Sequence, residues 1–226
     1  MLFRSRDGRV LWYQGERVPC VLDHPDLRVA VDHSAIDFEV GHDPAHRDQA
    51  VARDEHTGEE YSAYYRIPRS TDDLLARMRL IELTTALGGT LLSIRDVGSD
   101  AMFALLGLLQ GAELERLQAF YERVRRDDLA VAVAQTDVKG DRSKAPHEQS
   151  DPDLHVRVVD RSDAGIVVRG AKVHTSLTPN CNEILVLPTR AMKPADADYA
   201  VAFAVTPDTP GDRKSTRLNS SHLVIS

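Results

Sequence analysis

The polar residues best suited to bind a ligand lie between Thr136 and Lys144, directly after the apolar run LAVAVAQ. This segment, TDVKGDRSK, holds one glycine, four hydroxyl or carboxylate side chains and three cations. Such a loop can present backbone N–H groups, a hydroxyl and a guanidinium to an anion or to a ring nitrogen. The sequence contains neither GxGxxG nor GxxxxGK[ST], so it predicts neither a Rossmann site nor a P-loop. On composition alone, a solvated loop of a β domain is the favoured interpretation.

Helices are predicted to precede this segment. Ser70 is followed three residues later by Asp73, which is typical of a capped helix start. One face of this helix is expected to hold Leu74, Met78, Ile81 and Thr85, and Gly88-Gly89 ends or kinks the helix. A further helix is expected from Asp23 and Pro25 to Ile36, and another from Ser99 to Gln110. The next helix, AELERLQAFYERVRRDD, has one apolar face, made of Leu114, Leu117, Tyr121 and Val124.

Short strands are predicted on either side of these helices. Residues 9–18 indicate a hairpin, whereas the polar residues 41–69 indicate an irregular surface excursion. After residue 127, DLHVRVV alternates, with Leu154, Val156 and Val158 on one face and His155 and Arg157 on the other. GIVVRGAKVHTS, EILVLPTR and YAVAFAVTP follow as closely spaced strands.

The predicted fold class is therefore α+β, with a helical N-terminal domain followed by an antiparallel β-barrel or sheet domain. We expect a mainly helical domain over residues 1–127 and a β domain over 128–212. Residues 213–226 fit neither pattern and resemble a translated vector sequence, so we expect them to be a non-native tail. A genuine basic tail is the alternative.

The formal net charge of −7 predicts no general attraction to nucleic acid or to an anionic membrane. Cys20 and Cys181 lie far apart and form no CxxC motif, which favours two reduced thiols. No run is apolar enough to predict a signal peptide or a membrane span. These features favour a cytoplasmic protein.

Seven segments, in the same order along the chain, resemble the 4-hydroxyphenylacetate 3-hydroxylase / 4-hydroxybutyryl-CoA dehydratase family. They are DGRVLWYQGERV…DHPDLR, STDDLLARMRLIE, QTDVKGDRSK, DPDLHVRVV, GIVVRGAKVHTS, EILVLPTRAM and DYAVAFAVTPDTPG. The resemblance covers residues 6–212. The resemblance implies an acyl-CoA dehydrogenase-like fold: a helical domain, a central β-barrel and a C-terminal helical bundle. That bundle would be missing here.

The resemblance also implies that FAD lies across the β domain. The implied cofactor-binding residues are Gln135, Thr136, Asp141, Arg142, Ser143, Lys144, His174, Thr175 and Ser176. A threonine hydroxyl suits a flavin ring heteroatom, because it both donates and accepts. Arg142 would meet a phosphate, or else pair with Asp141. His174 would contact the cofactor, or else be a satisfied sheet histidine.

The family has two branches. One consists of oxygenases that take reduced FAD from a separate reductase and hydroxylate a phenol with oxygen. The other acts on acyl-CoA esters and adds an iron–sulfur cluster, for which two expected cysteine positions hold Leu92 and Asp96. Neither residue suits a thiolate cluster, so we predict no metal site, although TDVKGDRSK and PTRAM look closer to the acyl-CoA branch.

Arg95 is the predicted catalytic residue. It matches an arginine that many relatives carry near the substrate pocket, where a guanidinium could anchor a phenolate or carboxylate. The alternative is a surface ion pair with Asp96 or Asp100.

We therefore expect a flavin-dependent monooxygenase acting on a phenolic or aromatic substrate, with a flavin reductase as partner. The alternatives are an acyl-CoA lyase or isomerase without the cluster, and an inactive truncated fragment. We expect this chain alone to be inactive, and the full-length protein to be a homo-oligomer.

Overall fold

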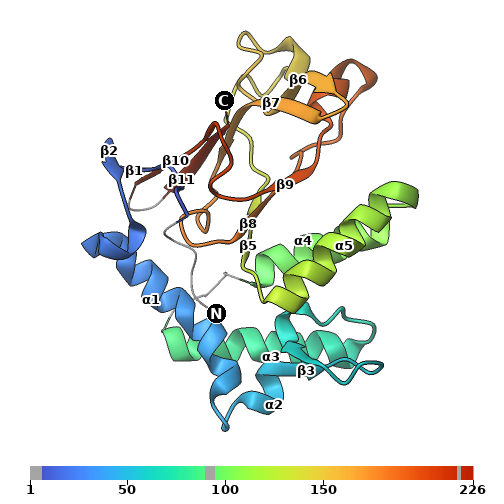
Figure 1. Cartoon of the computed structure of the whole chain (residues 1–226). Helices are drawn as coiled ribbons and strands as arrows, with labels where there is room; N and C mark the ends of the chain where they lie inside the picture. The colour runs from blue at the N-terminus through green and yellow to red at the C-terminus, as the bar shows by residue number, and fades with distance from the viewer. Residues whose placement is uncertain (1–6, 90–94, 218–219, 226) are drawn as a thin grey trace. The chain divides into compact units, whose positions relative to one another are not determined.

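A computed structural model describes residues 7–89, 95–217 and 220–225. The chain divides into two compact units, shown in Figure 1. Among the described residues, the first unit holds 25–89 and 95–131, and the second combines 7–24 with 132–217 and 220–225. No helix in the described residues is long and apolar enough to cross a membrane.

The first unit is mainly helical. Its helices are α1 (Pro25–Glu39), α2 (Arg47–Ala50), α3 (Thr71–Gly88), α4 (Asp96–Leu108) and α5 (Gly111–Asp127). A two-stranded sheet pairs β3 (Val51–Arg53) with β4 (Glu60–Ser62). Short 3-10 turns occupy Val40–His42 and Ala63–Tyr65.

The start of α3 follows from its capping residues, as predicted. The Asp73 amide donates to Ser70 Oγ at 3.2 Å, and Asp73 Oδ2 accepts from the Arg69 amide at 3.0 Å. The helix ends at Gly88, and Gly89 takes the left-handed conformation with φ of 70°.

The face of α3 predicted from its apolar spacing is buried only in part, and its member Ile81 packs against the apolar cluster that contains Leu80. Leu74 and Met78 are more than half exposed, and the buried residues are Arg77, Leu80 and Thr84. Arg77 lies inside because its guanidinium donates to the carbonyls of Tyr64 and Asp96, both at 2.9 Å. A buried arginine with such acceptors is stable although its residue type predicts exposure.

The prediction for α5 is confirmed, since Leu117, Tyr121 and Val124 are its buried residues. The α4 helix begins at Asp96, three residues before the predicted start. Gly98 of α4 lies against the Val131 backbone, so the two segments approach more closely than a side chain would allow.

Residues 41–69 are not an irregular surface excursion. They contain α2, β3 and β4, and they carry Tyr64 and Tyr65, which are 1% and 0% exposed. Tyr64 packs with Val40, Ala50 and Leu80 in one apolar cluster. The Tyr64 hydroxyl lies 2.8 Å from Thr84 Oγ1, and the Tyr65 hydroxyl donates to the Leu129 carbonyl. Both rings are therefore buried with their polar ends satisfied.

The second unit is built from short strands. They are β1 (Leu11–Tyr13), β2 (Glu16–Val18), β5 (Val131–Ala134), β6 (Arg157–Ser162), β7 (Gly165–Val173), β8 (Glu183–Val186), β9 (Phe203–Val205), β10 (Asp212–Arg217) and β11 (Ser220–Ile225). One sheet has the order β2-β1-β10-β11-β7-β6 and a second has the order β5-β8-β9. The β1–β10 pair is parallel, whereas β6 and β7 form an antiparallel hairpin whose register shifts at Val158 to Asp160. Short 3-10 turns occupy Val21–Asp23, Pro146–Glu148 and Pro194–Tyr199.

A mixed helical and sheet architecture is confirmed, but a closed barrel is not seen among the described residues. The predicted hairpin at 9–18 forms as β1 and β2, and its pairing with β10 places it in the second unit. Strands β10 and β11 contain most of the predicted tail, and the foreign origin of that tail stays a prediction. His155 lies before β6 and is 2% exposed, so it is buried together with Val156 and Val158, which the alternation placed on the other face.

Candidate functional site

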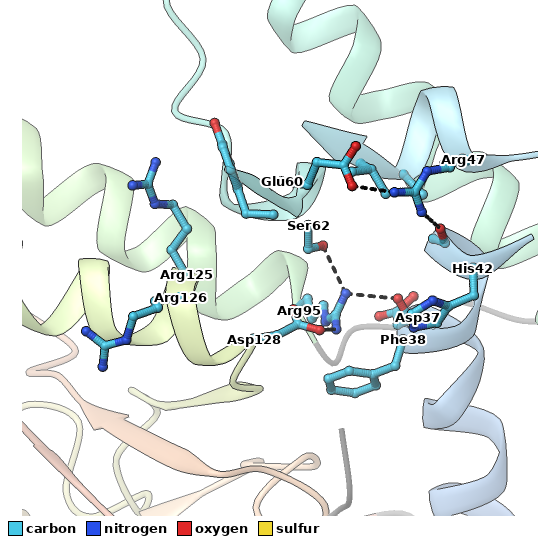
Figure 2. A pocket seen from close by; sticks show the side chains of 14 residues that line it. Asp37, Phe38, His42, Arg47, Glu60, Ser62, Arg95, Arg125, Arg126 and Asp128 are labelled. Carbon is cyan, nitrogen blue, oxygen red and sulfur yellow. Dashed lines mark hydrogen bonds and ion pairs between the residues drawn. The ribbon is translucent and has the colours of Figure 1, made fainter. Parts of the chain in front are cut away.

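Arg95 is held inside the helical unit by three separate segments. It is the N-terminal cap residue of α4 and is only 3% exposed. Its Nη1 donates to the Asp37 carbonyl at 3.0 Å and to Ser62 Oγ at 2.9 Å, and its Nη2 donates to the Asp128 carboxylate. The guanidinium carbon lies 3.8 Å from the centre of the Phe38 ring. Figure 2 shows Arg95 among these partners.

The alternative of a surface ion pair with Asp96 or Asp100 is not what the structure shows. Asp100 pairs with Arg77 at 2.7 Å, and Asp96 accepts from the Val97 amide at 2.8 Å. Leu92, the other position considered for a cluster cysteine, lies outside the described residues. Among the residues that are described, no group of three or more His, Cys, Asp or Glu side chains is arranged to hold a metal.

Arg95, Asp37 and Asp128 line a cavity of about 220 Å³ together with Phe38, His42 and Ser62 (Figure 2). Three buried polar atoms here have no hydrogen-bond partner among the described residues: Arg95 Nε, Asp37 Oδ2 and Asp128 Oδ1. One donor and two acceptors without partners thus belong to side chains that line one cavity. Such a set suits a small group that both accepts and donates, such as a hydroxyl.

Asp37 has a perturbed pKa. Burial raises the pKa of this carboxyl to about 6, against the opposing effect of the Arg95 charge and the Tyr64 hydroxyl. The nearby Asp96 charge adds to the rise. The pKa of Asp96 is itself raised, mainly by burial. The folded chain therefore favours a neutral Asp37 in mildly acidic solution.

Replacing Asp37 with asparagine is expected to weaken the pH dependence of stability. Between about pH 4 and 6 the folded chain binds more protons at Asp37 than the unfolded chain, so stability falls as pH rises through this range. The rise in the pKa of Asp37 from its ordinary value to about 6 corresponds to about 3 kcal/mol. Asp37→Asn should therefore be more stable than the parent at pH 7 and should change less between pH 4.5 and 7. Urea unfolding at both pH values measures this.

The matched control is Asp32→Asn, which changes an exposed aspartate on the same helix. It should keep the parent's pH dependence. If the stability of Asp37→Asn and that of the parent changed equally between pH 4.5 and 7, folding would not raise the pKa of Asp37.

The two segments predicted to bind a cofactor are neighbours in the second unit. The Val173 amide donates to the Thr136 carbonyl at 2.9 Å, and Asp137 forms an isolated antiparallel bridge with Lys172. The polar loop after β5 therefore begins beside the end of β7, where His174, Thr175 and Ser176 follow. The catalytic candidate Arg95 belongs to the other unit.

The predicted binding residues differ in exposure. Thr175 alone is buried, at 2% exposed, and its Oγ1 has no hydrogen-bond partner among the described residues. His174 is exposed and has a positive φ of 58°. The other exposed residues of the set are Gln135, Thr136, Asp141, Arg142, Ser143, Lys144 and Ser176.

The loop is ordered by contacts of its own. Asp141 Oδ1 accepts from the Ser143 hydroxyl at 2.6 Å and from the Ser143 amide at 3.0 Å, and these bonds lower the pKa of Asp141. Lys144 Nζ lies 3.9 Å from Asp141 Oδ2. Gln149 accepts from the Asp141 amide and donates to the Asp141 carbonyl, at 3.0 and 2.8 Å. The pair considered between Arg142 and Asp141 does not form, and Arg142 has no ion pair within the described chain.

A buried polar cluster beneath this loop was missed by sequence reasoning. Lys172, Asp137 and His155 are 2%, 9% and 2% exposed. The Lys172 ammonium donates to the Asp137 carboxylate and, at 2.9 Å, to the Gln135 carbonyl. His155 Nδ1 lies 3.4 Å from Asp137 Oδ2 but is poorly oriented for a hydrogen bond, so Lys172 is the main partner.

The protonation states follow from this packing. Burial alone would raise the pKa of Asp137, but the neighbouring His155 ring and Lys172 ammonium hold it at about 2. Burial lowers the pKa of Lys172, and the Asp137 carboxylate opposes that shift. No spacing in the sequence identified Lys172 as a buried residue or Asp137 as its partner.

Comparisons with known proteins bear on what this arrangement does. The sequence profile described as 4-hydroxyphenylacetate 3-hydroxylase N terminal matches residues 3–221. The 4-hydroxybutyryl-CoA dehydratase/vinylacetyl-CoA-Δ-isomerase of Clostridium aminobutyricum is 34% identical over 217 residues, which cover 92% of this chain and 44% of that protein. The 4-hydroxyphenylacetate 3-monooxygenase oxygenase component of Thermus thermophilus is 31% identical over 204 residues, covering 89% and 42%.

Solved structures of similar proteins share the fold. An oxygen-tolerant archaeal 4-hydroxybutyryl-CoA dehydratase from N. maritimus superposes with a TM-score of 0.89 at 26% identity, covering 99% of this chain and 50% of that chain. The oxygenase component of 4-hydroxyphenylacetate 3-monooxygenase complexed with FAD gives a TM-score of 0.84 at 25% identity, covering 99% and 51%. The chain thus spans about half the length of the relatives it matches.

Proposed function

Because this chain belongs to the 4-hydroxyphenylacetate 3-hydroxylase family, we propose that it forms part of a flavin-dependent monooxygenase that hydroxylates a phenolic or related aromatic substrate. The enzyme would use reduced FAD from a separate reductase. Thermus thermophilus has a relative named as the oxygenase component of such a monooxygenase, and a similar oxygenase was crystallised with FAD. Within this chain, the observation that carries the proposal is the contact between the Thr136 carbonyl and the Val173 amide, which joins the two proposed FAD-binding segments.

The residues at this junction fit a flavin. Thr175 Oγ1 is a buried polar atom without a partner among the described residues, and a flavin ring heteroatom would supply one. Thr136 offers an exposed hydroxyl at the base of the loop, and Arg142 offers a guanidinium that meets no carboxylate in the described structure. Arg142 would hold a phosphate of FAD. FAD, when bound, would supply the redox chemistry with oxygen.

The cavity beside Arg95 fits the polar end of a phenol. A phenol hydroxyl would accept from Arg95 Nε and donate to an unpartnered oxygen of Asp37 or Asp128. Both terminal nitrogens of Arg95 are already engaged, so its proposed contact with substrate is through Nε. In this role Arg95 would orient the substrate and stabilise negative charge on the phenol oxygen.

Replacing Thr175 with valine tests the cofactor site. The change removes an unpartnered buried hydroxyl, so stability without FAD should stay the same or rise. The Kd for FAD should rise by about tenfold, the usual consequence of losing one well-formed hydrogen bond. Titration of the parent and variant with FAD, followed by flavin fluorescence, measures both affinities, and thermal unfolding without FAD measures stability.

Thr84→Val is the matched control, since Thr84 is a buried threonine of the helical unit whose hydroxyl is bonded to Tyr64. It should lower stability and leave the FAD affinity unchanged. Failure of the parent chain to bind FAD would contradict the proposed function.

A second candidate is a lyase or isomerase acting on an acyl-CoA. The 34% identity to the Clostridium aminobutyricum dehydratase/isomerase, against 31% for the Thermus thermophilus oxygenase, favours it. Oxygen uptake with reduced FAD and 4-hydroxyphenylacetate would support the monooxygenase. Turnover of 4-hydroxybutyryl-CoA without oxygen would support the lyase or isomerase.

The third candidate is a fragment that has no activity of its own. Both assays are therefore run on the 226-residue chain and on a protein of the relatives' length that carries it. FAD binding without turnover by the chain alone would agree with this third candidate.

A further inference from the structure

We infer that Lys172 and Asp137 are positioning residues, which together clamp the loop after β5 to the end of β7 so that both face one FAD molecule. The inference rests on the proposed function for its ligand. Its geometry is independent of that proposal, because every contact lies within the second unit.

The clamp acts on both sides of Thr136. The Lys172 ammonium donates to the carbonyl of Gln135, which precedes Thr136, and to the carboxylate of Asp137, which follows it. Thr136 itself accepts from the Val173 amide through its carbonyl. A single side chain from β7 therefore fixes the residues that flank the proposed flavin contact.

A third segment completes the clamp. Thr189 Oγ1 accepts from the Asp137 amide at 3.1 Å and donates to the Gln135 carbonyl. The Gln135 carbonyl thus receives two donors, one from Lys172 and one from Thr189. With both lone pairs of this carbonyl occupied, the backbone at the start of the loop has little freedom to rotate.

The chemistry of the pair indicates positioning rather than simple stabilisation. Lys172 is buried, and burial lowers the pKa of its ammonium group. An apolar side chain at this position would pack without the cost of losing hydration. Replacing a buried ion pair by apolar residues is often neutral for stability, whereas removing one partner is costly. What apolar residues cannot reproduce is the donor to Gln135 and the fixed distance between the loop and β7.

Single and double variants of the pair therefore separate a role in positioning the loop from a role in stabilising the fold. Lys172→Met alone leaves the Asp137 carboxylate buried without its cation, so it should lower the unfolding temperature strongly. The double variant Lys172→Met/Asp137→Leu removes the stranded charge and should recover most of that loss. Its Kd for FAD should still be about tenfold or more above that of the parent, because the loop has lost its ion pair with β7 and the donor from Lys172 to the Gln135 carbonyl.

Lys214→Met/Asp212→Leu is the matched control. Lys214 and Asp212 form another buried lysine–aspartate pair in the same unit, 0% and 3% exposed, and Lys214 also donates to a carbonyl, that of Pro207. The control carries the same chemical change but does not touch the loop, so it should leave the Kd for FAD unchanged.

FAD fluorescence titration and thermal unfolding are measured on the 226-residue parent, Lys172→Met and both double variants. A stable Lys172→Met/Asp137→Leu protein that binds FAD as tightly as the parent overturns the clamp and leaves the proposed function intact. The clamp is also overturned if the Lys214→Met/Asp212→Leu control raises the Kd for FAD as much as Lys172→Met/Asp137→Leu does. A parent that binds no FAD overturns the clamp and the proposed function together.

Discussion

Replacing Arg95 with methionine is expected to lower the free energy of unfolding of the helical unit by about 2–4 kcal/mol. The substitution leaves the Asp128 carboxylate without its cation, and it removes the donors to the Asp37 carbonyl and to Ser62. It also removes the guanidinium from the face of Phe38. The measurement is urea unfolding followed by circular dichroism at 222 nm, which reports the helices.

Arg79→Met is the control for this prediction, because Arg79 is an exposed arginine of α3. Its effect should stay within about 0.5 kcal/mol. Adding Asp128→Asn to Arg95→Met should restore part of the lost stability, since the stranded charge disappears. If Arg95→Met lost less than about 1 kcal/mol, the buried network around Arg95 would carry little energy.

Replacing Gly170 with alanine is expected to destabilise the second unit by about 3 kcal/mol. Gly170 has a φ of 137°, which L side chains rarely adopt, and an added Cβ would lie 2.4 Å from the His155 carbonyl oxygen and 2.6 Å from Val156 Cα. Both neighbours are backbone atoms, so β7 would have to move away from the preceding segment. Fluorescence of Trp12, the single tryptophan of the chain, reports unfolding of this unit.

Gly107→Ala is the comparison for Gly170→Ala. Gly107 lies within α4, and an added Cβ there would meet nothing within 4 Å. Alanine at this position should raise stability by about 0.5–1 kcal/mol, the ordinary gain from replacing a helical glycine. A Gly170→Ala variant as stable as the parent would mean that β7 can separate from the segment around His155 without cost.

The secondary structure that local residues determine was predictable. The Ser70 cap, the apolar face of α5 and the strands after residue 127 all depend on neighbours in sequence. Buried polar side chains were not predictable in this way. Arg77 and Tyr64 are stable inside only because acceptors from other segments meet them, and no local pattern identifies those acceptors.

The candidate site shows the same division. Resemblance to a family identified the two segments, and the structure places the Thr136 carbonyl beside the Val173 amide. The resemblance did not identify Lys172. A lysine in an alternating strand is most often exposed, and its partner Asp137 lies 35 residues away. Arg95 was expected to point a free guanidinium at a substrate, whereas its terminal nitrogens are already bonded within the chain.

The central claim is that FAD binds where the 136–144 loop meets the end of β7. Amide hydrogen exchange of the chain with and without FAD tests it most directly, because protection is read segment by segment. We predict that FAD slows exchange within residues 135–144 and 174–176, and that the α3 and α5 amides exchange as before. Protection by FAD confined to the helical unit, with the 135–144 amides unchanged, would contradict the account.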